Sequence, residues 1–116
     1  MTDETIMAIR EFLKLYTFSK KRIDDINGRI NYSVLDSERV IYLKNNQQLY
    51  IAIVMKVDCW LSDLDDMEKE IIKYRFFQRL NISQIADRLH YKNHSSPSRL
   101  ISDILKKIKK RGDLID

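Results

Sequence analysis

The stretch LNISQIADRLHY, residues 80–91, is the most informative segment for the expected fold of this chain. Its spacing predicts a short helix that is capped by Ser83. The inward residues of this helix are expected to be Ile85, Ala86 and Leu89. Ala86 lets a following helix cross closely because its side chain is small. The stretch therefore predicts one half of a tightly packed helix pair.

The stretch HYKNHSSPSR, residues 90–99, separates the short helix from the next one. It has no large aliphatic residue, holds both histidines and the only proline, and packs three serines into four positions. We expect Tyr91 to help bury the turn. Pro97 should lie in the first turn of the next helix, where its missing N–H is tolerated. Ser96 is the preferred N-cap of that helix, with Asn93 as the alternative.

A longer helix follows, and its apolar residues recur every three or four positions: Leu100, Ile101, Ile104, Leu105 and Ile108. Two packed helices around a short polar turn form the pattern of a helix-turn-helix, whose second helix can enter the major groove of DNA. Small polar side chains near the start of that helix can bond base edges or phosphates, whereas bulky aliphatic ones would block the approach. This region therefore predicts binding to duplex DNA.

The contact residues follow from this placement. Bases are expected to be contacted by His94, Ser95, Ser96, Ser98, Arg99 and Ser102. Phosphates are expected to be contacted by Gln84, Arg88, Lys92, Asn93, Lys106, Lys107 and Lys110. Arg99 can present a bidentate fork to guanine; the alternative is a surface ion pair with Asp103. In the alternative for the others, the serines and His94 are capping and turn residues, and the lysines form a solvated helix end.

Upstream, SDLDDMEKE at residues 62–70 places acidic residues at the start of another helix, where the exposed amides favour them. Asp65 is the expected N-cap, with Glu68 three residues later. The expected core of this helix is Met67, Ile71, Ile72, Tyr74, Phe76 and Phe77. It should end near Asn81. The segment 62–116 thus reads as a three-helix DNA-binding domain.

The N-terminal segment 1–61 predicts a helical arm. Apolar residues at helical spacing indicate one helix over about 4–26, ended by the Asn27-Gly28 pair, and a second over about 36–61. The two are expected to form an antiparallel hairpin; the alternative is that their seam pairs with a second copy of the chain. A second apolar face on the later helix predicts packing on more than one side: Ile53, Met55, Cys59 and Trp60. The fold class is all-α.

Charge is unevenly distributed along the 116 residues, whose net charge is +4. Residues 88–111 hold eight lysines or arginines and one acidic residue, a net of +7, so the remainder sums to −3. An anionic partner is one explanation, and a solvated basic tail is the other.

The run from Leu61 to Arg111 resembles the DNA-binding region 4 of bacterial sigma factors. The matching residues are Leu61, Leu64, Glu68, Ile71, Ile72, Arg75, Phe76, Ser83, Ile85, Ala86 and Leu89. A helical arm before such an end is also similar to small phage and prophage late-gene regulators of the RinA/ArpU type. The resemblance implies a transcription regulator that contacts RNA polymerase. His90 stands where the family usually has glycine, so a left-handed turn should be difficult there.

Several other functions have little support in the sequence. His90 and His94 straddle a turn and no second ligand pair accompanies them, so no zinc site is expected. No glycine-rich phosphate loop or activated nucleophile indicates an enzyme, and no cofactor is expected. The single Cys59 and the absence of a long apolar run predict a cytoplasmic protein with no membrane contact. The favoured function is a sequence-specific activator acting with RNA polymerase; the alternatives are a protein–protein adaptor that mimics a sigma factor, and a simple repressor.

Overall fold

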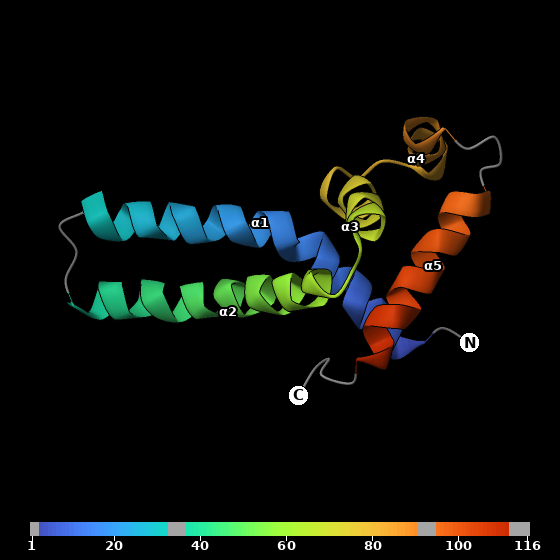
Figure 1. Ribbon diagram of the computed structural model, residues 1–116. Coiled ribbons are helices and arrows are strands. Elements are labelled where there is room, and N and C mark those ends of the chain that lie inside the picture. The colour runs from blue at the N-terminus through green and yellow to red at the C-terminus, as the bar shows by residue number, and fades with distance from the viewer. Residues whose placement is uncertain (1–2, 33–36, 91–94, 112–116) are drawn as a thin grey trace.

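The computed structural model describes residues 3–32, 37–90 and 95–111, and all regular structure in these ranges is helical, as predicted. None of the helices in these ranges is both long and apolar enough to cross a membrane. In chain order (Figure 1) the elements are α1 (Glu4–Tyr32), α2 (Ser37–Ser62), α3 (Asp66–Ile72), the π-helical turn η1 (Lys73–Phe77), α4 (Ile82–Leu89) and α5 (Ser95–Lys110).

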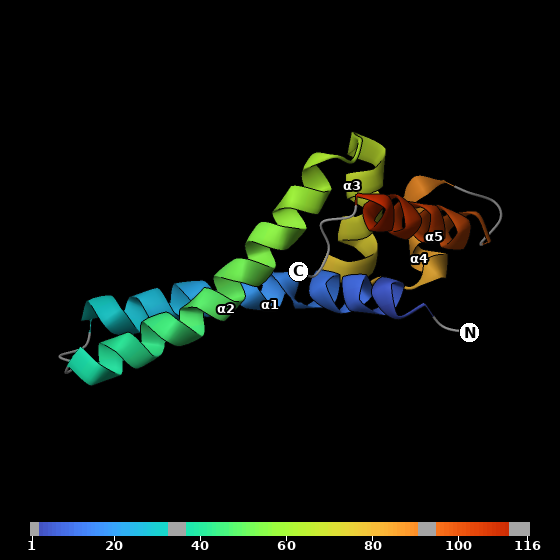
Figure 2. The ribbon, with the colours of Figure 1, turned by 90° about the horizontal axis from the view of Figure 1, so that it is seen from below.

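Helices α1 and α2 lie side by side as a long antiparallel hairpin that extends away from the other helices (Figures 1 and 2). The molecule is therefore elongated, with extents of 57 × 30 × 26 Å. The predicted end of α1 at Asn27-Gly28 is wrong, because α1 continues to Tyr32. A glycine costs a helix only about 1 kcal/mol. Contact with α2 offsets that cost: the Gln47 side-chain amide donates to the Asn27 side chain at 2.7 Å and to a carbonyl of α1 at 3.0 Å.

The outer side of α2 is exposed, so the prediction that this helix packs on more than one side is wrong for most of its length. Met55 is 66% exposed and Leu49 is 67% exposed, and Cys59 also lies at the surface. Along the hairpin α2 packs mainly against α1, which covers one face. Trp60 is fully buried, as expected, because the other helices cover this end of α2.

One core joins the hairpin to the C-terminal helices. Ile9 and Leu13 of α1 and Val57 of α2 are buried in it. The Phe12 ring meets the Trp60 ring edge-on, with centroids 5.7 Å apart. The turn before α3 contributes Leu64, and the C-terminal helices contribute Ile71, Ile72, Phe76, Ile85, Ile101, Ile104, Leu105 and Ile108. The first turns of α1 thus support the helix-turn-helix directly. The division into domains 1–61 and 62–116 stays a prediction.

Two capping boxes set the starts of α3 and α4. At α3 the prediction is confirmed: the Asp65 side chain accepts from the Glu68 amide at 2.8 Å, and the Glu68 side chain accepts from the Asp65 amide at 3.0 Å. At α4 the predicted cap Ser83 is wrong. Asn81 is the N-cap, and it forms the same reciprocal pair with Gln84 at 2.8 and 2.9 Å. The N-cap lies two residues before the predicted one because Gln84 completes this box.

The backbone at His90 is left-handed, with φ 61° and ψ 32°, and its N–H closes the end of α4 on the carbonyls of Ala86 and Asp87. The expectation that a non-glycine residue resists this turn is therefore wrong. Helix α5 begins at Ser95, so Ser96 is inside it and is not the N-cap. Pro97 lies in the first turn, as predicted. Tyr91 and the alternative cap Asn93 lie outside the described residues.

Candidate nucleic-acid interface

Helix α5 has one fully packed face. Its buried residues are Pro97, Ile101, Ile104, Leu105 and Ile108. They recur at three- and four-residue spacing and contact α1, α3 and α4. Burial of this whole stripe fixes the rotation of α5 about its own axis. The rotation in turn decides which side chains reach the surface.

The opposite face of α5 is polar and basic. Ser98, Arg99, Lys106 and Lys110 are exposed and Ser102 is half-buried. Successive members are one, three or four residues apart, so four turns of helix present them on one side. Within the described part of the chain, Arg99 has no ion-pair or hydrogen-bond partner, and the alternative pairing with Asp103 is not formed there. We call these five residues the α5 outer face.

Helix α4 contributes Gln84 and Arg88, which are four residues apart and both exposed. Gln84 already serves the capping box through its side-chain oxygen. The Arg88 guanidinium carbon lies 5.8 Å from the centre of the Tyr74 ring, which steadies a long side chain at the surface. A hydrogen bond to Glu70, with burial, raises the pKa of the Tyr74 hydroxyl. Tyr74 therefore stays neutral beneath Arg88 at physiological pH.

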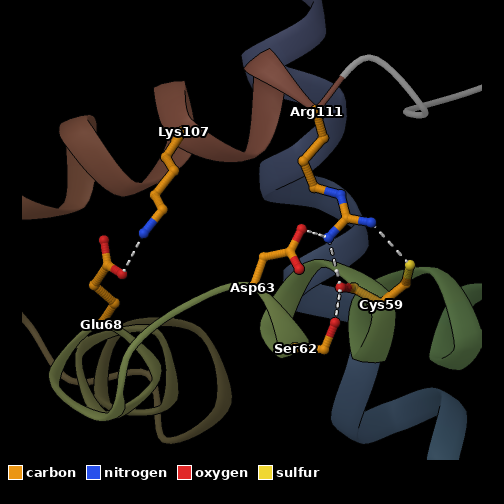
Figure 3. A network of polar contacts seen from close by, with 6 residues as sticks. All are labelled: Cys59, Ser62, Asp63, Glu68, Lys107 and Arg111. Carbon is orange, nitrogen blue, oxygen red and sulfur yellow. Dashed lines mark hydrogen bonds and ion pairs between the residues drawn. The ribbon is translucent and has the colours of Figure 1, made fainter.

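Three basic residues near the end of α5 pair with other segments of the protein, and two of them are drawn in Figure 3. Lys107 pairs with Glu68 at 2.9 Å, and this hydrogen bond raises the pKa of Lys107. Arg111 pairs with Asp63 and donates to the Cys59 carbonyl at 2.9 Å. Lys109 pairs with Asp3, the residue just before α1, and this hydrogen bond lowers the pKa of Asp3. Of the predicted phosphate contacts on α5, Lys106 and Lys110 thus lie on the outer face, whereas Lys107 points toward α3.

The remaining predicted contacts lie near the turn. Lys92, Asn93 and His94 are outside the described residues. Ser95 begins α5, and Ser96 is half-buried in its first turn. The described site therefore consists of the α5 outer face with Gln84 and Arg88 from α4.

The sequence interpretation missed a group of basic residues beside this site. Arg10 and Lys14 of α1 come together with Arg75 of η1 and with Arg79, which follows it, around one open cavity. The four-residue spacing of Arg10 and Lys14 was a signal that they share a side of a helix. Nothing in the sequence pattern indicates that this side meets η1.

Comparison with known protein families gives one match: residues 60–110 match the family model of sigma-70, region 4. The match spans α3, η1, α4 and all of α5, together with the last residues of α2. No curated protein and no solved structure matches the chain. The C-terminal part of the chain is thus a region 4-like helix-turn-helix, a DNA-binding regulatory domain of transcription-related proteins, while α1 and most of α2 lie outside the match.

Proposed function

We propose that this protein is a sequence-specific regulator of transcription that binds duplex DNA, acting as a sigma-like activator with bacterial RNA polymerase. The observation that carries the proposal is the α5 outer face. It presents exposed Ser98, Arg99 and Lys106 above a fully buried stripe, in a segment that matches sigma-70 region 4. The proposal includes a phage or prophage origin and a cytoplasmic location, which agree with a helical arm joined to a region 4-like domain.

In this proposal α5 enters the major groove with its N-terminal half. Arg99 reads guanine through a bidentate fork, and Ser98 and Ser102 bond neighbouring base edges. His94, Ser95 and Ser96 contribute further base contacts from the start of the helix. Lys106 and Lys110 contact phosphates farther along α5, and Lys107 adds a weaker contact because Glu68 neutralises it. Gln84, Arg88, Lys92 and Asn93 contact phosphates from α4 and the turn.

The exposed outer side of α2 supports a homodimer formed through the hairpin. Four large apolar residues are more than half exposed there: Ile41, Tyr42, Leu49 and Met55. Apolar side chains grouped on one helix face favour burial against a partner. A two-fold dimer would place two α5 helices on DNA, as palindromic half-sites require. Sedimentation should give a dimer for the wild type and a monomer for Leu49→Glu.

The proposed function is tested by selection from a pool of random duplexes. We expect the wild type to enrich a shared motif, and the double variant Arg99→Ala/Ser102→Ala to enrich a motif that has lost its preference at the base pairs contacted by these two residues. Lys44→Ala, which removes an exposed charge on the hairpin, is the matched control and should enrich the same motif. Recovery of no motif by the wild type would contradict sequence-specific binding.

A wild type that enriches no motif but still binds RNA polymerase would favour the alternative, an adaptor that mimics a sigma factor. Transcription from a promoter that carries the enriched motif then separates activator from repressor. The proposed activator raises transcript yield when it is added with RNA polymerase. The simple repressor lowers it.

A further inference from the structure

An open cavity of about 380 Å³ lies where α1 crosses the helix-turn-helix. Its lining comprises Arg10, Lys14, Arg75, Phe76 and Arg79. Four of these five residues are basic and none is acidic. Within the part of the chain that the structure describes, the one ion pair of these residues joins Lys14 to its neighbour Glu11 on α1, at 3.4 Å between two largely exposed side chains. Four gathered positive charges repel one another, so the cavity favours an anion.

Two of the arginines are held in position by the protein. The Arg75 guanidinium donates to the Leu80 carbonyl at 3.0 Å. The Arg10 guanidinium carbon lies 6.0 Å from the centre of the Phe76 ring, which is only 3% exposed. The cavity thus has an apolar floor and donors that have already lost part of their freedom. Such donors bind a ligand with a smaller loss of conformational entropy.

Arg79 occupies a position that favours glycine or asparagine. Its φ is 57°, in the left-handed region, where Cβ crowds the following carbonyl oxygen. Within the described residues its side chain forms no hydrogen bond or ion pair. The chain therefore places a strained arginine where it adds charge to a cluster that is already positive. This left-handed residue ends η1, where the Leu80 N–H donates to the Tyr74 carbonyl at 2.8 Å.

A second cavity connects this cluster to the proposed DNA-binding face. It measures about 140 Å³ and is lined by Arg10, Arg75, Ile82, Ser98 and Ile101. Ser98 belongs to the α5 outer face, and Ile82 is the first residue of α4. A DNA strand that borders the major groove occupied by α5 would run along this side of α4. Each DNA strand carries one negative charge per about 3.4 Å. A row of phosphates therefore complements a cavity lined by four cations better than a ligand with a single carboxylate would.

We propose that the cavity formed by Arg10, Lys14, Arg75 and Arg79 binds a phosphate group, and that this phosphate belongs to the backbone of the duplex engaged by α5. The inference rests on the proposed function. It extends the DNA footprint beyond the sigma-like segment, because Arg10 and Lys14 belong to the arm. The arm then contributes to DNA affinity and not to base recognition.

The test compares Arg10→Gln/Arg79→Asn with the charge-matched control Lys21→Gln/Lys44→Gln on the exposed hairpin. Asparagine is chosen because it tolerates a left-handed backbone. The substitution at residue 79 should therefore not lower the thermal unfolding midpoint. Arg75 is left intact because it holds the Leu80 carbonyl. Binding to the motif duplex is measured over a salt series. Lys14→Gln, a single change at an exposed side chain, is the second variant should the double one fold poorly.

We expect the slope of log K against log salt to become shallower by about 0.9 for the double variant, since the contact to one phosphate is lost. The enriched motif should be unchanged, and the control should keep more of the wild-type slope than the cavity variant does. A slope equal to that of the control overturns the inference while the proposed function stands. A wild type that binds no duplex is a different result, because it removes the proposed function first.

A titration with inorganic phosphate, read from the amide resonances of Arg10 and Arg79, separates the two sources of phosphate. Phosphate binding together with a shallower DNA slope supports the inference. Phosphate binding with an unchanged DNA slope assigns the cavity to free phosphate and overturns the DNA assignment.

Discussion

The two ends of α5 use their basic residues differently. Near the N-terminal end, Arg99 is exposed and has no partner among the described residues. At the C-terminal end, Lys107, Lys109 and Arg111 each pair with a carboxylate of another segment. In sequence the residues form one positive run, but in the structure only part of it is free to meet a ligand.

The pairs at the C-terminal end orient α5 more than they stabilise it. Exposed ion pairs contribute about 0–1 kcal/mol each. Their partners, however, lie in three places: Asp3 at the start of α1, Asp63 after α2, and Glu68 in α3. Three contacts from one helix end to three segments restrict rotation of α5, so Arg99 and its neighbours are presented in a fixed direction.

The largest effect is expected from the buried stripe that underlies both ends. Leu105→Ala should lower the free energy of unfolding by about 2–5 kcal/mol, because it leaves a cavity in a fully buried site. Lys110→Ala, on the outer face, should change it by no more than about 0.5 kcal/mol. Chemical denaturation measures both. Equal losses would mean that the two faces of α5 are not distinguished as described.

The two arginines at the two ends provide the next comparison. Arg99→Ala should lose about 1–3 kcal/mol of discrimination at one base pair and leave the unfolding midpoint unchanged. Arg111→Ala should keep the sequence preference and lower stability by about 1 kcal/mol, because it loses its bonds to Cys59 and Asp63. Binding to single-base-pair variants of the motif and denaturation separate the two. A changed sequence preference in Arg111→Ala would contradict the division of α5.

The lysines of α5 allow exposed and paired side chains to be compared when the same amount of charge is removed from each group. Lys106→Gln/Lys110→Gln should make the slope of log K against log salt shallower by about 2, since two phosphate contacts are lost. Lys107→Gln/Lys109→Gln removes the same charge from the paired end and should change the slope by a smaller amount. Fluorescence anisotropy over a salt series measures both. Identical slopes for the two variants would show that the whole run acts as one diffuse patch.

The smallest effect concerns acid titration of the paired end. The hydrogen bond from Lys109, with that from the Ile6 amide, lowers the pKa of Asp3. Since a lowered pKa stabilises the fold above the ordinary value, this contribution is lost as pH falls through the folded-state pKa of Asp3. In a carboxyl NMR titration Lys109→Gln should raise the pKa of Asp3 toward its ordinary value. Lys110→Gln is the control and should leave it unchanged. If Asp3 kept its low pKa in Lys109→Gln, the hydrogen bond from Lys109 would not be the cause of that low pKa.

Local patterns predicted the parts of the fold that depend on nearby residues. The capping box of Asp65 and Glu68 and the inward stripe of α5 are such features. The cap of α4 was misplaced because Ser83 and Asn81 are both good caps, and only the reciprocal contact of Gln84 selects Asn81. The left-handed His90 was not expected because non-glycine residues seldom pay that conformational cost.

The features that sequence could not predict depend on distant segments. Lys109 pairs with a residue 106 positions away, so no local pattern reveals that it is neutralised. The basic cavity likewise joins Arg10 of α1 to Arg79, which is far along the chain. For the same reason α1 continues past Gly28, since a residue of α2 holds it. The sequence therefore predicted which helix carries the site. Which of its basic residues are paired, and which residues of other segments lie beside it, required the tertiary structure.

The most direct test of the account is a map of amide chemical-shift changes when the motif duplex is added to the labelled protein. We predict the largest changes at Ser98, Arg99 and Ser102, with the far half of the hairpin, about 20–32 and 37–50, unchanged apart from any dimer contact. Changes concentrated on the exposed side of α2, with none in α5, would contradict DNA recognition by the α5 outer face.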